Sequence, residues 1–255
     1  MTFRPTALFP VLGLSLGLGV VPTASADLLL TGEYDSATTN ANQIDTEATD
    51  SANANQLSLT QFKTLVETAF AGQTGGVATF DQAGDSVFSG DQRLYFADNS
   101  VLATFQRTNA GTSVQTGSTN RTPISGASGF GGSDSYGFTF SVDDQITAVG
   151  VTLISRLATA SDATVTATFA DAMGAEVQQV AATSNLANSN GGDDTFFGFA
   201  APTGKYLTGL TVSTPGYFTW ADDLGVVTGD GVVPEPGSMG LLALGLPCLA
   251  ARRRR

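Results

Sequence analysis

The clearest hydrophobic pattern in the chain lies between residues 58 and 71. Ser58 or Thr60 can cap the first turn of a helix there, and Gly72 follows the last apolar position. Between them, apolar side chains recur at the spacing of one helical face, at Phe62, Leu65, Val66, Ala69 and Phe70. The pattern predicts one short amphipathic helix near the N-terminal side of a folded domain, with its apolar face packed on a sheet.

After Gly72 the pattern changes to short runs of β-branched and aromatic residues separated by turn residues. Such runs predict strands at 77–80, 93–96, 101–105, 136–142, 146–154, 163–169, 176–182, 195–200, 207–213 and 218–220, with a last strand from Leu224. Residues 171–176 read as a hairpin turn, 188–194 as a loop and 108–132 as a long surface loop. Many short strands at this spacing predict an all-β fold, a jelly-roll-like β-sandwich over residues 58–231.

The first 57 residues do not follow this pattern. Residues 1–26 contain one basic residue, an apolar stretch and the small residues Ala24 and Ala26, which is the pattern that a signal peptidase cleaves. They predict a secretory signal peptide. Residues 27–57 are polar with few large apolar side chains, and we expect a flexible leader that contains at most a short strand at 28–30.

Composition narrows the possible functions. The chain has no histidine, which excludes Ser-His-Asp and Cys-His catalysis and every histidine metal site. Its net charge is −12. Without residues 1–26 and 232–255, six basic and twenty-two acidic residues remain, a net charge of about −16 that makes nucleic acid and anionic membrane surfaces poor partners. Cations, neutral glycans or a basic protein are better candidates.

Three pairs of adjacent aspartates are the most conspicuous polar features, at 143–144, 193–194 and 222–223. Calcium takes six to eight oxygen ligands, and loops between strands can supply them. Asp222 and Asp223 are the best candidates, because they lie between two predicted strands, and we expect Asp81 or Asp85 to complete the site. The alternative is that all three pairs are solvated turn acids, and for the other two pairs we favour it.

One aromatic group follows Pro215 and Gly216. If Tyr217 and Trp220 are exposed, their rings can stack on sugars, whereas Phe218 reads as a core residue. A pair of carboxylates facing each other across a cleft would instead indicate a glycosidase, but sequence spacing does not identify such a pair. Glycan binding and carboxylate-based hydrolysis therefore both remain open at this point.

The C-terminal residues have a different organisation. Pro234, Glu235 and Pro236 form an extended, non-helical link. An apolar run over 237–251 follows, which as a helix spans about 22 Å, short of a hydrocarbon core of about 30 Å. Snorkelling side chains can close that gap. The four basic residues after the run act as a cytoplasmic stop signal: Arg252, Arg253, Arg254 and Arg255.

This order of triplet, hydrophobic helix and arginine cluster resembles the PEP-CTERM sorting domain of Gram-negative bacteria. The resemblance covers residues 233–255 and implies recognition by an exosortase, a membrane transpeptidase, and removal of the tail near Pro234–Pro236. It also implies a transient inner-membrane anchor and delivery to the outer surface or extracellular matrix, often in association with exopolysaccharide or biofilm. Cys248 lies inside the apolar run and reads as filler, with lipidation as the alternative.

Two classes of function follow. The first is a non-enzymatic surface or matrix protein that binds glycan, with calcium as a possible stabilising ion. The second is a secreted carbohydrate-active hydrolase that uses a carboxylate pair. The absence of histidine, the low content of charged residues and the sorting tail favour the first class.

Overall fold

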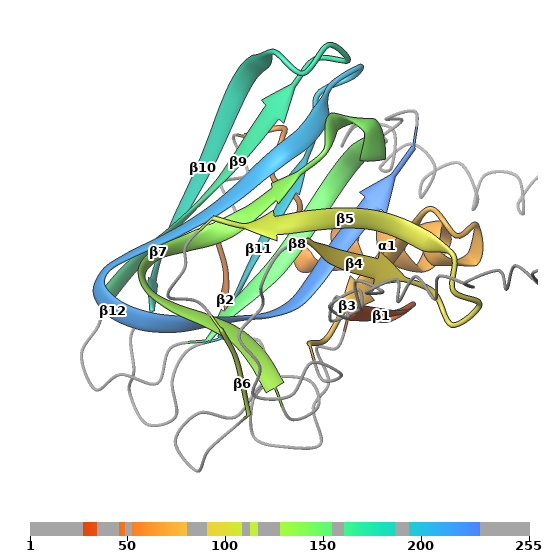
Figure 1. Ribbon diagram of the computed structural model, residues 1–255. Coiled ribbons are helices and arrows are strands. Elements are labelled where there is room, and N and C mark those ends of the chain that lie inside the picture. Colours follow the sequence, from red (N-terminus) through yellow and green to blue (C-terminus); the bar gives the residue numbers. More distant parts are fainter. Residues whose placement is uncertain are drawn as a thin grey trace, which may run out of the picture.

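The computed structural model describes residues 28–34, 46–48, 53–80, 91–108, 113–116, 128–154, 161–186 and 194–229. These residues form one helix of 13 residues, α1 (Leu59–Ala71), one short 3-10 turn, η1 (Val142–Asp144), and twelve strands (Figure 1). The strands are β1 (Leu28–Thr31), β2 (Thr46–Glu47), β3 (Gly75–Ala78), β4 (Gln92–Tyr95), β5 (Val101–Arg107), β6 (Ser113–Thr116), β7 (Ser128–Phe140), β8 (Ile146–Ile154), β9 (Ser161–Ala170), β10 (Glu176–Leu186), β11 (Asp194–Ala200) and β12 (Tyr206–Thr228). The predicted all-β sandwich with one helix is confirmed.

Two layers enclose the core. The first, called here the β9 sheet, has the order β10-β9-β12-β7 and uses the N-terminal part of β12. The second, called here the β8 sheet, has the order β2-β11-β8-β12-β3 and uses the C-terminal part of β12. Strands β1, β4 and β5 connect β3 back to β7, so that β12-β3-β1-β4-β5-β7 closes into a ring.

The strand β12 belongs to both layers, and Figure 1 shows it curving along the molecule from one to the other. Residues 209–214 pair with β7 and β9, whereas residues 225–228 pair with β8. Two register shifts bend the strand, one between Thr214 and Phe218 and one between Asp222 and Gly225. Sequence analysis predicted three strands here, because Pro215-Gly216 and Asp222-Asp223 look like turns. They are irregularities inside one 23-residue strand.

The core consists mainly of side chains that alternate with polar ones along the strands of the β9 sheet. In β9 every second side chain is buried, namely Ala163, Val165, Ala167 and Phe169. Strand β8 is different, because all nine of its residues are buried. It has the core on one face and α1 on the other, as expected for a strand covered on both faces.

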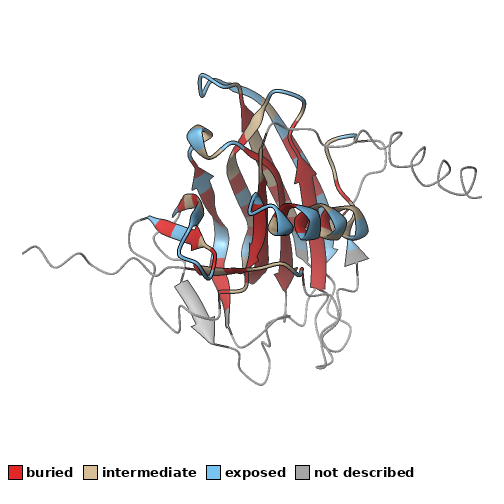
Figure 2. Cartoon of the chain, turned by 90° about the vertical axis from the view of Figure 1, so that its right-hand side faces the viewer, coloured by how far each residue is buried: buried red, intermediate tan, exposed pale blue. Residues whose placement is uncertain are grey.

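The helix α1 lies across the outer face of the β8 sheet (Figure 2). Ser58 caps its first turn, and Ser58 and Gln61 form a complete capping box. Phe62, Val66 and Ala69 are buried, and Leu65 and Phe70 are partly buried. The predicted helix and its apolar face are therefore confirmed.

Two glycines in the sheet make room for this helix. A Cβ atom at Gly150 would lie 2.5 Å from Cε1 of Phe62, and one at Gly225 would lie 2.6 Å from the same atom. Both distances are far below van der Waals contact. Phe62 therefore packs directly on the backbone of β8 and β12, which requires glycine at both positions.

Residues 27–57 were expected to form a flexible leader, and their described parts correct that expectation. Strand β1 pairs with β3 and β4, and Leu28 and Leu30 are buried. Strand β2 pairs with β11, and the backbone N–H of Leu57 donates to the carbonyl of Gly198 over 3.0 Å. The sandwich therefore begins at Leu28. The polar composition around β2 did not indicate this, because β2 extends the sheet through backbone hydrogen bonds to β11, whereas β1 lies between β3 and β4.

The expected loop at 108–132 is also partly wrong. Strand β6 lies within it, and β7 begins at Ser128 and pairs with β6 over Ser128–Gly131. Glycine in this part of β7 is needed for packing, because a Cβ atom at Gly131 would lie 2.5 Å from Cζ of Phe218 and 2.8 Å from Cδ1 of Trp220. The hairpin predicted at 171–176 is confirmed between β9 and β10, with Gly174 at φ 81°.

The close packing of Phe62 gives a first testable prediction. Gly150→Ala should lower the free energy of unfolding by about 1–3 kcal/mol, because the added methyl group overlaps the Phe62 ring. In the double variant Gly150→Ala/Phe62→Leu the loss should be smaller than the sum of the two single losses, since the shorter side chain relieves the overlap. Denaturant unfolding measures both quantities.

A matched control is Gly209→Ala, where the new Cβ atom would lie 3.5 Å from Thr168, an ordinary contact. Equal destabilisation by both Gly→Ala changes would contradict this explanation of how the helix is seated.

Candidate functional site

The structure places the predicted site residues in very different environments. Asp222 and Asp223 are fully buried at the second bend of β12. Asp143 and Asp144 lie in the turn η1, where an Asp144 carboxylate oxygen accepts the backbone N–H of Thr104 over 3.2 Å. Partial burial raises the pKa of Asp144, and repulsion from Asp143 adds to that shift. Asp81, Asp85 and Asp193 lie outside the described residues.

The Asp222-Asp223 pair shapes the bend. Asp223 has φ 49°, and its backbone N–H donates to Oδ1 of Asp222 over 2.9 Å. Immediately before the pair, Ala221 is still paired with β7, and immediately after it Leu224 pairs with β3. The side chain of Asp222 therefore binds a backbone donor at the point where the strand changes partner, which is a structural role.

A buried tyrosine lies beside this pair. The hydroxyl groups of Tyr34 and Thr152 share a hydrogen bond, and the Tyr34 ring makes edge contacts with Phe62 and Phe196. The pKa of Tyr34 is raised well above its usual value, chiefly by burial and further by the negative charge of Asp223 and Asp222. The phenol is therefore held neutral, as a hydrogen-bonding group within the packing under α1.

The calcium site predicted at Asp222 and Asp223 stays a prediction, because Asp81 and Asp85, which were expected to complete it, lie outside the described residues. Calcium needs six to eight oxygens, often including water. Both carboxylates have no exposed surface, and no group of three or more metal-binding side chains occurs among the described parts of the chain. The sequence indicated carboxylates between two strands, but it did not reveal that the bend buries them.

The two aromatic side chains that were candidates for stacking on sugars also lie in different environments. Trp220 is only 3% exposed and packs with Ile154 and Phe218, so its ring is not offered to a ligand. Its side chain is part of the packing at the end of the β8 sheet. Tyr217 is half-buried and stays a candidate. Trp220 is buried because it lies inside one continuous strand. Sequence analysis predicted a short separate strand at this position.

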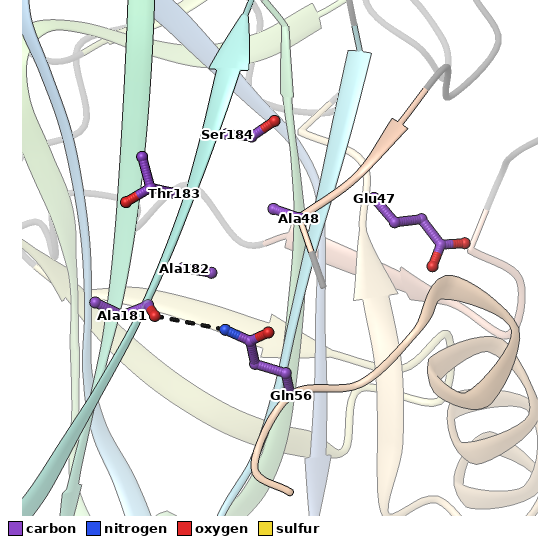
Figure 3. A pocket seen from close by; sticks show the side chains of 7 residues that line it. All are labelled: Glu47, Ala48, Gln56, Ala181, Ala182, Thr183 and Ser184. Atoms are coloured by element: carbon purple, nitrogen blue, oxygen red, sulfur yellow. Dashed lines mark hydrogen bonds between the residues drawn. The ribbon is translucent and has the colours of Figure 1, made fainter. Parts of the chain in front are cut away.

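A pocket that sequence analysis did not identify lies at the edge of the sandwich (Figure 3). It occupies about 320 Å³ between β10 and the segment that contains β2, and its lining residues are Glu47, Ala48, Gln56, Ala181, Ala182, Thr183 and Ser184. The Gln56 side chain crosses toward β10, where its Nε2 donates to the carbonyl of Ala181 over 3.4 Å. The two walls are 125 residues apart in sequence, so that no local motif could have revealed the pocket.

The pocket exists because each layer ends in an edge strand on this side. Among the described strands, β10 pairs only with β9, and β2 pairs only with β11. The two layers are joined here by polar side chains, since Nε2 of Gln178 also donates to Oδ1 of Asn55 over 3.3 Å. Because successive side chains of a strand point to opposite faces, Ala182 and Ser184 face the inside of the sandwich and Thr183 faces outward (Figure 3).

The buried tyrosines give a prediction for alkaline pH. Burial also raises the pKa of Tyr136, whose hydroxyl lies 3.2 Å from that of Thr219. The unfolded chain ionises its tyrosines near pH 10, whereas the folded chain keeps Tyr34 and Tyr136 neutral. The stability that these groups contribute is therefore complete below about pH 10 and falls as pH rises above it.

Tyr34→Phe/Tyr136→Phe should reduce this fall, and unfolding midpoints between pH 8 and 11.5 would measure it. At neutral pH the double variant should lose about 1 kcal/mol for each hydroxyl hydrogen bond. An unchanged slope above pH 10 would show that neither phenol is responsible.

The residues predicted to control export lie outside the described part of the structure. They are Ala24 and Ala26 at the signal cleavage position and Pro234, Glu235, Pro236 and Arg252 to Arg255 in the tail. Among the described residues no helix is long and apolar enough to cross a bilayer, and the expected apolar helix at 237–251 is not among them. Only Gly229, Asp230 and Gly231 separate the end of β12 from residue 232.

Three solved structures resemble part of the sandwich. The N-terminal CBM22-1–GH10 modules of endo-1,4-beta-D-xylanase 10B from Clostridium thermocellum, complexed with xylohexaose, match at 13% identity and a TM-score of 0.35, over 49% of this chain and 26% of theirs. The C-terminal family 22 carbohydrate binding module of the same xylanase matches at 12% identity and a TM-score of 0.34, over 49% of this chain and 87% of its own. TmCBM61, in complex with beta-1,4-galactotriose, matches at 12% identity and a TM-score of 0.31, over 49% of this chain and 87% of its own. At these values the likeness transfers neither a ligand nor a binding site.

The C-terminal residues give a definite match. No curated protein matches the chain. Residues 232–255, however, match the family model of the PEP-CTERM protein-sorting motif, and these are the residues in which the triplet, the apolar run and the arginines occur in order. The chain therefore carries a PEP-CTERM protein-sorting motif, which marks it as an exported protein sorted by an exosortase.

Proposed function

We propose that this protein is a non-enzymatic component of the cell surface or extracellular matrix, and that its sandwich binds a neutral exopolysaccharide in the pocket between β10 and β2. The observation that carries the proposal is the mainly uncharged, hydrogen-bonding lining of that pocket in a strongly acidic protein that is exported. The sorting motif provides the delivery, and the pocket provides the contact with the ligand.

The lining of the pocket suits a sugar. The hydroxyl group of Ser184 and the amide of Gln56 can each donate and accept hydrogen bonds, as sugar hydroxyls do. The methyl groups of Ala48 and Ala182 provide small apolar surfaces between them. A volume of about 320 Å³ is at the small end for ligand sites and fits one or two sugar units rather than a long chain.

The positions of the acidic residues favour binding over hydrolysis. A glycosidase places two carboxyl groups about 5–10 Å apart on either side of the scissile bond. Among the described residues that line this pocket, Glu47 is the only acidic one. Asp222 and Asp223 are adjacent and fully buried, so that they do not face a substrate. A hydrolase would need a second carboxylate, and the described part of the lining contains none.

Sorting gives one prediction. Glu235→Ala, or deletion of Arg252 to Arg255, should leave the protein in the membrane fraction, because the exosortase no longer recognises the altered signal and does not remove the tail. Fractionation of the native host, with immunodetection of the sandwich, measures this. Release of both variants at the level of the natural protein would contradict the sorting account.

Binding gives a second prediction. Gln56→Ala/Ser184→Ala should weaken the affinity for neutral polysaccharide from the native matrix at least tenfold, because two hydrogen bonds of about 1 kcal/mol each are lost. Thr68→Ala, an exposed change on α1, is the control and should have no effect. Isothermal titration measures affinity, and a reducing-end assay on the same samples measures turnover. Turnover that Glu47→Gln abolishes would overturn the proposal in favour of a hydrolase.

A further inference from the structure

The outer face of the β9 sheet presents rows of hydroxyl groups. Strand pairing places four residues side by side in one row, namely Thr183 on β10, Thr164 on β9, Ser213 on β12 and Ser135 on β7. The next row along the strands contains Ala181, Thr166, Thr211 and Gly137, and the one after it Gln179, Thr168, Gly209 and Thr139. We call these three rows the hydroxyl face.

This face is open to solvent and uncharged. Its threonine, serine and glutamine side chains are exposed or half-buried, while the residues that alternate with them form the core. None of the twelve positions carries a charge, in a chain with a net charge of −12. Acids flank the face at both ends: Asp162 and Asp134 lie beyond the row that contains Thr183, and at the other end Oε1 of Glu176 accepts a hydrogen bond from Nε2 of Gln179 over 2.9 Å. Within the three rows a partner therefore meets only uncharged side chains.

The hydroxyl groups are also held in place. Threonine is branched at Cβ, which restricts its χ1 angle, and a strand fixes the direction in which the side chain leaves the sheet. Oγ1 of Thr164 lies 2.9 Å from Oγ1 of Thr183, so that neighbouring strands order each other's hydroxyls. A ligand that binds this face meets a preformed pattern and orders few side chains on binding.

The spacing of the rows suggests the shape of the ligand. Neighbouring strands are about 4.8 Å apart, which is close to the length of one pyranose unit in an extended β-linked chain. Three such intervals separate β10 from β7, a distance of about 14 Å. Thr183 begins the first row on the outer side of β10, and the next residue, Ser184, faces the proposed sugar pocket on the inner side, so that the face and the pocket meet at the edge strand β10.

We propose that the hydroxyl face is an extended binding surface for a neutral, β-linked polysaccharide, which lies across the strands with one sugar unit per strand and enters the pocket over the edge strand β10. This inference rests on the proposed function, since it extends the same site. Because these rows contain no aromatic rings, each sugar unit contributes little binding free energy. The affinity then arises from the sum over several units.

A length series tests this directly. The probes are β-1,4-linked glucose oligosaccharides of one to six units, titrated into the folded protein by calorimetry or NMR. The affinity should rise about fivefold for each added unit, as one net hydrogen bond gives, and should level off at about five units, where the row ends. α-1,4-Linked glucose oligosaccharides curve away from a straight row and should show no such rise.

Substitutions identify the surface. Thr166→Val/Thr211→Val removes two hydroxyls and keeps the β-branched shape, so the gain with length should shrink while the affinity for one or two units stays the same. Thr211→Glu places a charge on the exposed centre of the face, and its control is Thr68→Glu, at an exposed position on α1 on the other layer. Unfolding midpoints confirm that each variant folds.

The results separate the two proposals. Binding of short probes with no gain from length, or a gain that the face variants leave intact, would overturn the hydroxyl face and leave the pocket standing. A gain with length that Thr211→Glu abolishes and Thr68→Glu retains is the expected result. If no neutral oligo- or polysaccharide of any length binds, the proposed function fails, and the extension fails with it.

Discussion

The structure depends on one strand that is shared between two layers. Strand β12 pairs with β9 and β7 in its first part and with β8 and β3 in its last, so that its backbone hydrogen bonds hold both sheets at a fixed distance and angle. A strand can change layers only if its register is interrupted, and β12 is interrupted at Thr214–Phe218 and at Asp222–Gly225. The second interruption is stabilised by a carboxylate that binds a backbone N–H.

This arrangement explains where function is and is not found. The Asp222-Asp223 pair and the only tryptophan of the chain are used to bend and pack β12, and both are buried. The same strand brings Gly225 beside Gly150, which allows Phe62 and α1 to cover the outer face of the β8 sheet. No helix among the described residues covers the outer face of the β9 sheet in this way. The surfaces that remain for a partner are therefore that face and the edge where β10 and β2 leave the layers open.

Sequence patterns predicted the parts of this fold that depend on local periodicity. The helix has its apolar face, its cap at Ser58 and its end before Gly72 where the spacing placed them, and strand 146–154 has the predicted bounds. Local patterns failed where one element serves two layers. Pro215, Gly216 and the Asp222-Asp223 pair have the composition of turns, and only the pairing with β7, β8 and β3 makes them part of one strand.

The candidate site was less predictable than the fold. The sorting motif is a linear signal and was read directly from the order of its residues. The pocket joins Gln56 to Ala181, and the hydroxyl face joins residues of four strands, so that neither has a signature at any one place in the sequence. The Thr-x-Thr-x-Thr alternation in β9 was a visible signal, but by itself it indicated only a strand with one solvated face.

The most direct test of the account is the intact mass of the protein isolated from the envelope and the culture fluid of its native host. The account predicts a chain that begins near Asp27 and ends near Pro236, either bare or joined to a surface group, because the signal peptidase and the exosortase have removed the two targeting segments. A mature chain that still ends at Arg255 would contradict it, since the tail would then be a permanent anchor and the protein would not reach the matrix in which the proposed ligand lies.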